Sequence, residues 1–253
     1  MQQIQRLELM MEKLKDHHSL TLKEIMELTG ASRDTARRDI VKLAENDQVE
    51  RNYGGISLPH TFKRLDDFLT REKESAPLKR RLGKKAASLL KNADQIYLDI
   101  STTIEAIPEY LKLKPETTVV TNSIDIADQL LRKTKAQVRL LGGYYLRDRR
   151  ATTDSAALKD MFGFNFNMSF ISAPGITADG VYYAYPEDIT FKQQIRRQSE
   201  KIALVIDHSR IGLKHNYIGL KLDQIDYCIT DESLPADLST ELKEQNVEII
   251  EGD

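Results

Sequence analysis

Residues 21–43 read TLKEIMELTGASRDTARRDIVKL, and this stretch decides how the N-terminal part of the chain folds. Thr21, followed three residues later by Glu24, is the pattern of a capping box, in which two amides at the start of a helix gain partners. Gly30 permits a sharp turn, and Ser32 is a favourable N-cap for a helix that follows it. The sequence therefore predicts two short helices joined by a tight turn.

The second of these helices has an apolar stripe and a face rich in arginine. Ala36, Ile40 and Leu43 recur at helical spacing and predict the buried side. At about 100° per residue, Arg38 points away from this stripe and Arg37 lies on one flank. A helix pair with these properties commonly places its second helix in the major groove of DNA. We therefore expect a helix-turn-helix that binds double-stranded DNA.

The segments on either side complete a winged version of this unit. Apolar residues at helical spacing over residues 4–14 predict a first helix that ends near His17. Residues 49–56 read VERNYGGI and predict two short strands around a Gly-Gly turn. A strand–turn–strand unit directly after a recognition helix is a wing, from which Arg51 and Tyr53 could reach the DNA backbone.

The expected DNA contacts follow from this arrangement. Residues at the N-terminus of the recognition helix should read base edges, and the others should mainly hold phosphates, although an arginine can also read guanine. The expected DNA-binding residues are Ser32, Arg33, Asp34, Thr35, Arg37, Arg38, Lys42, Arg51 and Tyr53.

The overall charge gives no support to nucleic-acid binding. The chain has 253 residues and a net charge of −2, and its first 60 residues hold nine Lys/Arg and ten Asp/Glu. The cations must therefore gather on one face, because phosphate binding needs local positive charge rather than a high isoelectric point. We find no apolar run of membrane-spanning length and no signal-peptide core, and we expect a cytoplasmic protein. The single cysteine, Cys228, excludes an internal disulfide and a cysteine-based metal site.

From about residue 77 the sequence alternates between strand and helix patterns, which predicts a largely parallel, Rossmann-like sheet covered by helices on both faces. Strands are expected at 95–100, 118–121, 138–141, 168–173, 202–207, 227–230 and 247–250. Helices are expected at 79–90, 104–111, 124–131, 158–162, 189–198 and 236–244. The expected α/β organisation is a winged helix-turn-helix domain at 1–57, a linker at 58–76 and an effector-sensing domain at 77–253.

Polar and glycine-rich turns follow these strands, at the edge where open parallel sheets bind ligands. Hydroxyl-rich turns at helix N-termini bind anions, because free amides and the helix dipole face the ligand. Ordinary N-capping explains one such turn, but several at one sheet edge favour a small, polar, phosphorylated ligand. The turn residues are Asp99, Ser101, Thr102, Thr103, Thr121, Asn122, Ser123, Gly142, Gly143, Asp207 and Arg210.

The order and spacing of these motifs resemble the DeoR family of regulators over nearly the whole chain. The hallmark of the DeoR-type helix-turn-helix is Ser-x-x-Thr-x-Arg-Arg-Asp followed by Arg-x-x-Gly-Gly. The matching head residues are Ser32, Thr35, Arg37, Arg38, Asp39, Arg51, Gly54 and Gly55. The residues that resemble the DeoR sensor domain are Asp99, Thr102, Thr103, Thr121, Asn122, Ser123, Gly142, Gly143, Glu187, Lys192, Asp207 and Ser209.

This resemblance implies a sequence-specific transcriptional regulator, most often a repressor, of carbohydrate-metabolism genes. It implies a body similar to ribose-5-phosphate isomerase that binds a phosphorylated sugar or related metabolite, and it adds Glu187 and Lys192 to the expected effector site. The expected partners are operator DNA, this effector and further copies of the chain in a dimer or tetramer. We expect no enzymatic activity, cofactor, metal or membrane partner.

Two residues depart from the family pattern. Ser101 stands where the family usually has glycine, and Arg210 stands where the motif shared with the isomerase has lysine. Arginine keeps the charge but presents a planar fork rather than a point ammonium. Because both residues belong to the expected effector site, the usual effector of the family cannot be assumed.

Two alternatives come from other functional classes. A phosphosugar isomerase with an appended helix-turn-helix would need a carboxylate to move a proton, and Glu187 or Asp207 could serve. The acidic Gly-Ala-Asp-Glu loop of the isomerase is missing, which argues against this enzyme. A head used only for protein–protein contact would suit its acidic balance, but Arg37, Arg38 and the wing argue against that alternative.

Overall fold

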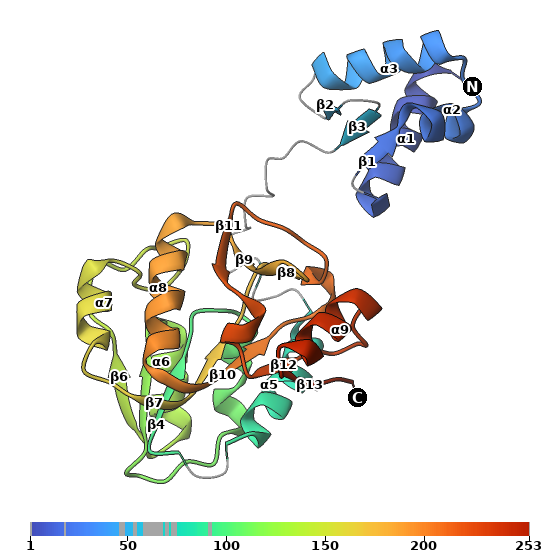
Figure 1. Ribbon diagram of the computed structural model, residues 1–253. Coiled ribbons are helices and arrows are strands. Elements are labelled where there is room, and N and C mark those ends of the chain that lie inside the picture. The colour runs from blue at the N-terminus through green and yellow to red at the C-terminus, as the bar shows by residue number, and fades with distance from the viewer. Residues whose placement is uncertain are drawn as a thin grey trace. The chain divides into compact units, whose positions relative to one another are not determined.

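The computed structural model describes residues 2–17, 19–45, 49–52, 55–57, 68, 71, 75–90 and 93–252 (Figure 1). The chain divides into two compact units, residues 1–64 and residues 65–253. This division falls inside the segment at 58–76 where the sequence predicted a linker. In the described part of the chain, the helices are too short or too polar to cross a bilayer.

The N-terminal unit has the predicted helix-turn-helix and wing. Thr21 and Glu24 form the capping box, in which the Thr21 hydroxyl accepts from the Glu24 amide and the Glu24 carboxylate accepts from the Thr21 amide. Gly30 ends the first helix of the pair at φ +66°, in the left-handed region that favours glycine. The helices are α1 (Gln3–His17), α2 (Leu22–Thr29) and α3 (Arg33–Glu45). The strands are β1 (Ser19–Thr21), β2 (Glu50–Asn52) and β3 (Gly55–Ser57), paired antiparallel in the order β1-β3-β2.

A buried carboxylate ties α3 to α1. The predicted stripe of α3 is buried, but Asp39, on the same helix, is also only 1% exposed. Its carboxylate accepts hydrogen bonds from Arg6 Nε at 2.6 Å and from Gln3 Nε2 at 3.0 Å. Burial would raise the pKa of Asp39, and the hydrogen bonds from Arg6 and Gln3 outweigh it, so that the pKa is lowered. The aspartate of the Arg-Arg-Asp motif therefore holds the helix in place.

The C-terminal unit is built on a parallel sheet, as predicted. Its described strands form a seven-stranded sheet in the order β13-β12-β10-β7-β4-β5-β6, in which every neighbouring pair is parallel. The strands are β4 (Gln95–Leu98), β5 (Thr118–Thr121), β6 (Gln137–Leu140), β7 (Phe166–Ile171), β10 (Ser199–Val205), β12 (Tyr227–Ile229) and β13 (Glu248–Ile250). The helices are α5 (Ala76–Ser88), α6 (Ile124–Lys133), α7 (Ser155–Met161), α8 (Pro186–Arg197) and α9 (Ala236–Glu244).

Two parts of this unit differ from the sequence prediction. The helix expected at 104–111 was wrong, because Pro108 lacks an amide hydrogen and breaks the segment into two short 3₁₀ helices. A second, antiparallel sheet of order β11-β9-β8 was not predicted, since its strands are too short to show a clear period. These strands are β8 (Gly175–Thr177), β9 (Gly180–Tyr183) and β11 (Tyr217–Leu220). The 3₁₀ helices are η1 (Ile104–Ala106), η2 (Pro108–Tyr110), η3 (His208–Arg210) and η4 (Leu222–Gln224).

The parallel sheet separates two apolar cores. Tyr97 of β4 packs on one face with residues of α7, α8 and α9, whereas its neighbours Ile96 and Leu98 pack on the other face with residues of α5 and α6. The chain runs outward from β4 through β5 to β6, and then restarts on the other side of β4 with β7. The carboxyl ends of β4 and β7 therefore lie at a topological switch point, where sheets of this type bind ligands.

The role of Asp39 can be tested by Asp39→Asn. At pH 7 this change should lower the midpoint of thermal unfolding of the N-terminal helices by about 5 °C, because a buried charge-assisted hydrogen bond is weakened. Because the pKa of Asp39 is lowered in the folded state, its charge stabilises the fold fully at pH values above the pKa of an unfolded aspartate, about 3.9. This stabilisation is lost as the pH falls through the pKa of Asp39 in the folded protein. The gap between the wild-type and variant midpoints should therefore shrink towards pH 3.

Circular dichroism of the full chain at both pH values measures this gap. Glu27→Gln is a matched control, since that carboxylate is exposed on α2. A gap that stays constant with pH would show that the charge of Asp39 does not hold the helices together.

Candidate functional site

The candidate DNA-binding face is the exposed side of α3. Ser32 caps this helix, because its hydroxyl accepts a hydrogen bond from the Thr35 amide at 3.3 Å. Ser32 and Asp34 are exposed, and Thr35 is half-buried. Four exposed cations of α3 have no ion-pair partner among the described residues, so positive charge gathers on an otherwise acidic head. They are Arg33, Arg37, Arg38 and Lys42.

The predicted wing residues are placed only in part. Arg51 lies in β2, where it pairs with Ile56 of β3. Tyr53 lies outside the described residues. The wing strand β2 packs beside the recognition helix α3 in the same unit. The DNA contact expected from Tyr53 stays a prediction.

A buried ion pair lies at the switch point of the parallel sheet. Asp99 directly follows β4, and Lys192 belongs to α8. The Lys192 Nζ and Asp99 Oδ2 atoms are 2.5 Å apart, and the two side chains are 4% and 0% exposed. Burial raises the pKa of Asp99, and the nearby ammonium of Lys192 opposes that rise. The structure thus brings together two residues that are 93 positions apart and that both belong to the expected effector site.

A second buried ion pair adjoins the first and was not predicted. Arg149, from the loop after β6, pairs with Asp188 on α8, and its guanidinium lies 4.7 Å from the centre of the Tyr185 ring. Asp188 also contributes to the raised pKa of Asp99. Glu187, which the sequence assigned to the site, is exposed, whereas its neighbour Asp188 is buried. Helix phase was the missed signal, because Asp188 lies four residues before Lys192 and seven before Ile195, on the face that α8 buries.

Two buried polar atoms near Lys192 have no hydrogen-bond partner among the described residues. They are Asp99 Oδ1 and the Tyr183 hydroxyl oxygen. The Tyr183 ring lies 5.3 Å from Lys192 Nζ, and burial together with the charge of Asp99 raises the Tyr183 pKa well above its usual value. Buried polar groups are nearly always satisfied in proteins, so an unsatisfied acceptor and hydroxyl beside a buried ammonium favour a polar ligand.

Gly219 in β11 allows Tyr183 to take this position. A side chain at residue 219 would place its Cβ 2.4 Å from the Tyr183 ring, much closer than atoms can approach. The ring therefore packs directly on the glycine backbone. The antiparallel sheet, which the sequence did not predict, supplies both residues and so contributes a wall of the candidate site.

The predicted hydroxyl turns after β4 and β5 are buried and largely occupied by internal hydrogen bonds. Asn122 accepts from the Tyr97 hydroxyl at 2.9 Å and from the Ile100 amide at 3.1 Å, and it donates to the Thr152 carbonyl at 2.9 Å. Ser123 caps α6. The hydroxyls of Ser101 and Thr121 accept hydrogen bonds from amides two residues further along. Thr102 and Thr103 are buried in the same turn as Ser101. These turns therefore shape the sheet edge around Asp99.

The Gly142–Gly143 turn approaches protein carboxylates. The Gly142 amide donates to Asp160 at 3.1 Å, and Gly143 adopts φ +118°. A Cβ at residue 143 would lie 2.4 Å from the Asp154 carboxylate, so only glycine fits there. The close approach that Gly143 permits is thus used by Asp154, the N-cap of α7.

The turn after β10 presents one unpaired cation. Asp207 accepts from the Ser209 amide at 3.0 Å and so caps its own short helix. Arg210 is half-buried and has no hydrogen bond or ion pair through its side chain among the described residues. Burial lowers the pKa of His215, which lies nearby in the sequence, and the charge of Arg210 lowers it further.

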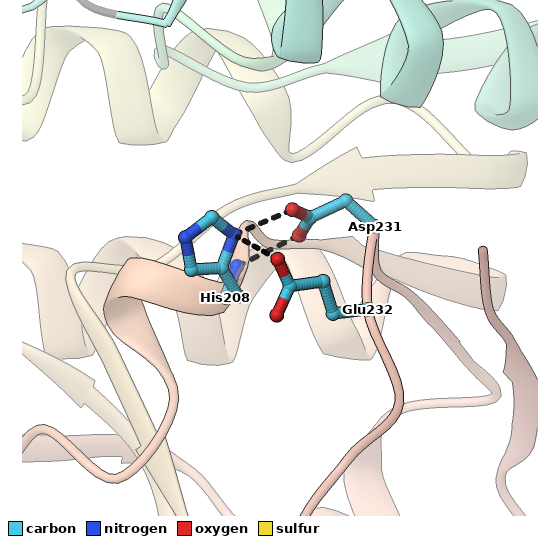
Figure 2. Close-up of side chains that lie close together, drawn as sticks. All are labelled: His208, Asp231 and Glu232. Carbon is cyan, nitrogen blue, oxygen red and sulfur yellow. Dashed lines mark hydrogen bonds and ion pairs between the residues drawn. The ribbon is translucent and has the colours of Figure 1, made fainter. Parts of the chain in front are cut away.

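His208 of this turn forms a cluster with Asp231 and Glu232, which follow β12 (Figure 2). His208 Nδ1 is 2.6 Å from Asp231 Oδ2 and 3.5 Å from Glu232 Oε1. The hydrogen bond with Asp231 raises the His208 pKa, and the His208 amide also donates to Asp231. The hydrogen bond between the imidazole and Asp231 accounts for this geometry, in which the ring nitrogen and the carboxylate oxygens lie within 4.8 Å of one another.

Comparison with known proteins identifies both regions. Residues 6–62 match the DeoR-like helix-turn-helix domain, and residues 74–232 match the DeoR C terminal sensor domain. The chain is 34% identical over 246 residues to the HTH-type transcriptional repressor GlcR of Bacillus subtilis, and the aligned region covers 97% of this chain and 95% of GlcR. It is 27% identical over 251 residues to the glycerol-3-phosphate regulon repressor of Escherichia coli, and the aligned region covers 98% of this chain and 99% of that protein.

Similarity to solved structures is weaker. Ribose 5 phosphate isomerase A from Neisseria gonorrhoeae is 15% identical, covers 57% of this chain and 55% of its own, and has a TM-score of 0.38. This likeness is too distant to inform the function.

The ion pair at the switch point can be tested with a double-mutant cycle. Lys192→Met should lower the free energy of unfolding by about 3–5 kcal/mol, because it leaves the Asp99 carboxylate buried without its counter-ion. The double variant Asp99→Asn with Lys192→Met should recover part of this loss. Urea unfolding of the full chain measures each value.

Lys214→Met is the control, because its ion pair with Asp179 is exposed and should contribute little. If the double variant is no more stable than Lys192→Met alone, then coupling between these two charges does not account for the loss.

Proposed function

Because the chain belongs to the DeoR family of DNA-binding transcriptional regulators, we propose that it is a repressor of carbohydrate-metabolism genes controlled by a phosphorylated sugar or related metabolite. The observation that carries the effector half of this proposal is the buried cluster at the switch point. There, a buried ammonium adjoins an unsatisfied carboxylate oxygen and an unsatisfied tyrosine hydroxyl.

The head supports binding to operator DNA. Its unpaired arginines project from α3, whose buried side is fixed by Asp39 and the apolar stripe, so the cationic face is held in one orientation. The proposed DNA contacts remain Ser32 to Thr35, Arg37, Arg38 and Lys42, with the wing residues Arg51 and Tyr53. Binding should occur as a homo-oligomer, a dimer or tetramer, since few phosphate contacts per head require paired heads for affinity.

The chemistry of the switch-point cluster suits a polyhydroxylated anion. Asp99 Oδ1 could accept from a sugar hydroxyl, and the Tyr183 hydroxyl could donate to or accept from another. Lys192 supplies positive charge at this cluster. We propose Arg210 as a second cation for a phosphate, because its planar fork suits two phosphate oxygens and its side chain has no ion pair among the described residues. The named relatives include a glycerol-3-phosphate regulon repressor, which is consistent with a small phosphorylated polyol or sugar as the effector class.

Other residues of the expected site take supporting roles in this proposal. The turns at 101–103 and 121–123 shape the edge around Asp99, and Gly142 and Gly143 fix the neighbouring loop. Glu187 lies on the exposed start of α8, at the border of the cluster. The proposed domains are the winged head at 1–57, a linker at 58–76 and the sensor at 77–253, and the proposed location is the cytoplasm.

The geometry favours a sensor over an isomerase. Glu187 and Asp207 are the carboxylates that could have moved a proton between substrate carbons. Glu187 is exposed, and Asp207 is engaged in capping η3. Asp99, the buried carboxylate of the site, is already paired with Lys192, which suits binding and orientation of a ligand.

A thermal-shift screen tests the effector class. Triose, pentose and hexose phosphates at millimolar concentration should include one that raises the unfolding temperature, because a ligand that binds only the folded state adds RT ln(1 + [L]/Kd) to its stability. A ligand at about 100 times its Kd adds about 2.7 kcal/mol. The unphosphorylated parent sugars should produce a much smaller shift, and Arg210→Ala should reduce the shift of the phosphorylated one. An unchanged unfolding temperature with every sugar phosphate would exclude this effector class.

Titration of a selected operator duplex tests the recognition helix. Arg38→Ala should cost about 1–3 kcal/mol of binding free energy and relax base preference if Arg38 reads a base, or reduce the salt slope by about one if it holds a phosphate. Arg80→Ala, an exposed change in the sensor unit, should leave both quantities unchanged. Undiminished affinity with an unchanged salt slope would remove Arg38 from the DNA interface.

A further inference from the structure

The chain that leads from the DNA-binding head into the sensor unit is anchored beside the candidate effector site. Phe68 belongs to the second unit, which begins at residue 65, immediately after the head unit ends. Its side chain is only 1% exposed, and its amide donates a hydrogen bond to the carbonyl oxygen of Asp148 at 3.0 Å. A buried aromatic ring and a backbone hydrogen bond together hold this point of the chain against the loop that follows β6.

The same loop reaches into the effector site through the next residue. Arg149 pairs with the buried Asp188 and lies over the Tyr185 ring. Asp188 lies four residues before Lys192 on α8, and both side chains are buried, so the two ion pairs share one face of that helix. The carbonyl that holds Phe68 and the guanidinium that enters the site therefore belong to adjacent residues, so one cannot shift far without the other.

The loop is held in a single, uncommon conformation. Arg150 adopts φ +54°, a left-handed conformation that non-glycine residues rarely take. Its guanidinium makes two hydrogen bonds to Asp125 of α6, at 2.6 and 2.7 Å. Two arginine pairs tie this loop to the helices, one to α6 and one to α8, and a backbone hydrogen bond from the Ile124 amide to the Arg150 carbonyl at 3.2 Å adds to the tie with α6. The pair on α8 lies on the same helix as Lys192.

A second contact holds the chain just after Phe68. The Arg71 guanidinium lies 5.8 Å from the centre of the Phe68 ring, and the Arg71 carbonyl accepts a hydrogen bond from the ammonium of Lys79 on α5. Lys79 is itself buried. The entry of the chain into the sensor unit is thus bound on one side to the loop at Asp148 and on the other side to α5.

We propose that Phe68 is a positioning residue whose contact with Asp148 transmits the occupancy of the effector site to the chain that leads to the DNA-binding head. This inference rests on the proposed function. An anionic ligand would compete with Asp188 for Arg149, because both present oxygens to the same guanidinium. Movement of Arg149 would displace the Asp148 carbonyl and weaken the anchorage of Phe68. The ligand then acts through its different affinity for the anchored and released states.

Amide hydrogen exchange of the full chain tests this coupling without any effector. Asp188→Asn weakens the hold of α8 on Arg149, and the Phe68 amide should then exchange at least about tenfold faster. Peptides from α9 and β13 should keep their wild-type rates, which shows that the unit remains folded. If Asp188→Asn does not fold, Arg149→Lys, which keeps the charge and loses the planar fork, should show the same acceleration.

Asp125→Asn is the matched control, because it weakens the other arginine pair of the same loop. It should accelerate exchange near Arg150 and leave the Phe68 amide close to its wild-type rate. The proposal is overturned if Asp188→Asn leaves exchange at Phe68 unchanged, or if Asp125→Asn accelerates it equally, since general loosening of the loop would then explain the effect. A sensor that binds no sugar phosphate would overturn the effector class and would leave this exchange result standing.

Discussion

The ion pair between Asp99 and Lys192 is the interaction around which the sensor unit is arranged. Removal of two charges from water costs several kcal/mol for each ion, and this cost is offset only where the partners meet in good geometry. The pair occupies the carboxyl end of the central strand β4, between β5 and β7, and α8 must pack at the position that delivers Lys192. Tyr183 on β9 closes the site from the antiparallel sheet, so the two sheets and α8 converge on one buried carboxylate.

The head also contains a buried aspartate paired with a cation, but there the pair holds two helices together. Asp39 is buried against α1 and receives hydrogen bonds from Arg6, which is 33 residues away. Asp99 in the sensor unit has one oxygen without a hydrogen-bond partner among the described residues, whereas Asp39 has hydrogen bonds to both of its oxygens. A satisfied buried carboxylate fixes the orientation of a helix, and an unsatisfied one offers an acceptor to a ligand. The difference in hydrogen bonding therefore separates a structural aspartate from a candidate binding aspartate.

In the sensor unit, the loop after β6 makes contacts that its composition does not reveal. Its run of arginines is typical of a solvated loop, yet Arg149 pairs with the buried Asp188 of α8 and Arg150 pairs with Asp125 of α6. The loop also receives the buried ring of Phe68. A loop that contacts both α8 and the incoming chain at Phe68 is what the proposed coupling requires.

Local patterns predicted the elements that depend on few residues. The capping box at Thr21, the left-handed Gly30 and the stripe of α3 were confirmed, because each depends on neighbours within one or two helical turns. The parallel sheet was also confirmed, since buried strands between amphipathic helices have few other arrangements. The helix expected at 104–111 failed at Pro108, where the local rule for proline should have outweighed the apolar spacing.

The candidate site was predicted as a region rather than as a set of contacts. Strand ends located Asp99, and the family resemblance added Lys192, whose helical spacing also favours burial of Asp188 over Glu187. Nothing in the spacing indicated that Arg149 and Tyr183 lie near these residues. By itself the sequence determined the winged head, the α/β body and the sheet edge that carries the polar turns, because periodicity and capping act over short distances. Only the tertiary structure decided which charges meet, because pairs such as Asp99 and Lys192 are created by the order of the strands and the packing of α8, and these are set by the whole chain at once.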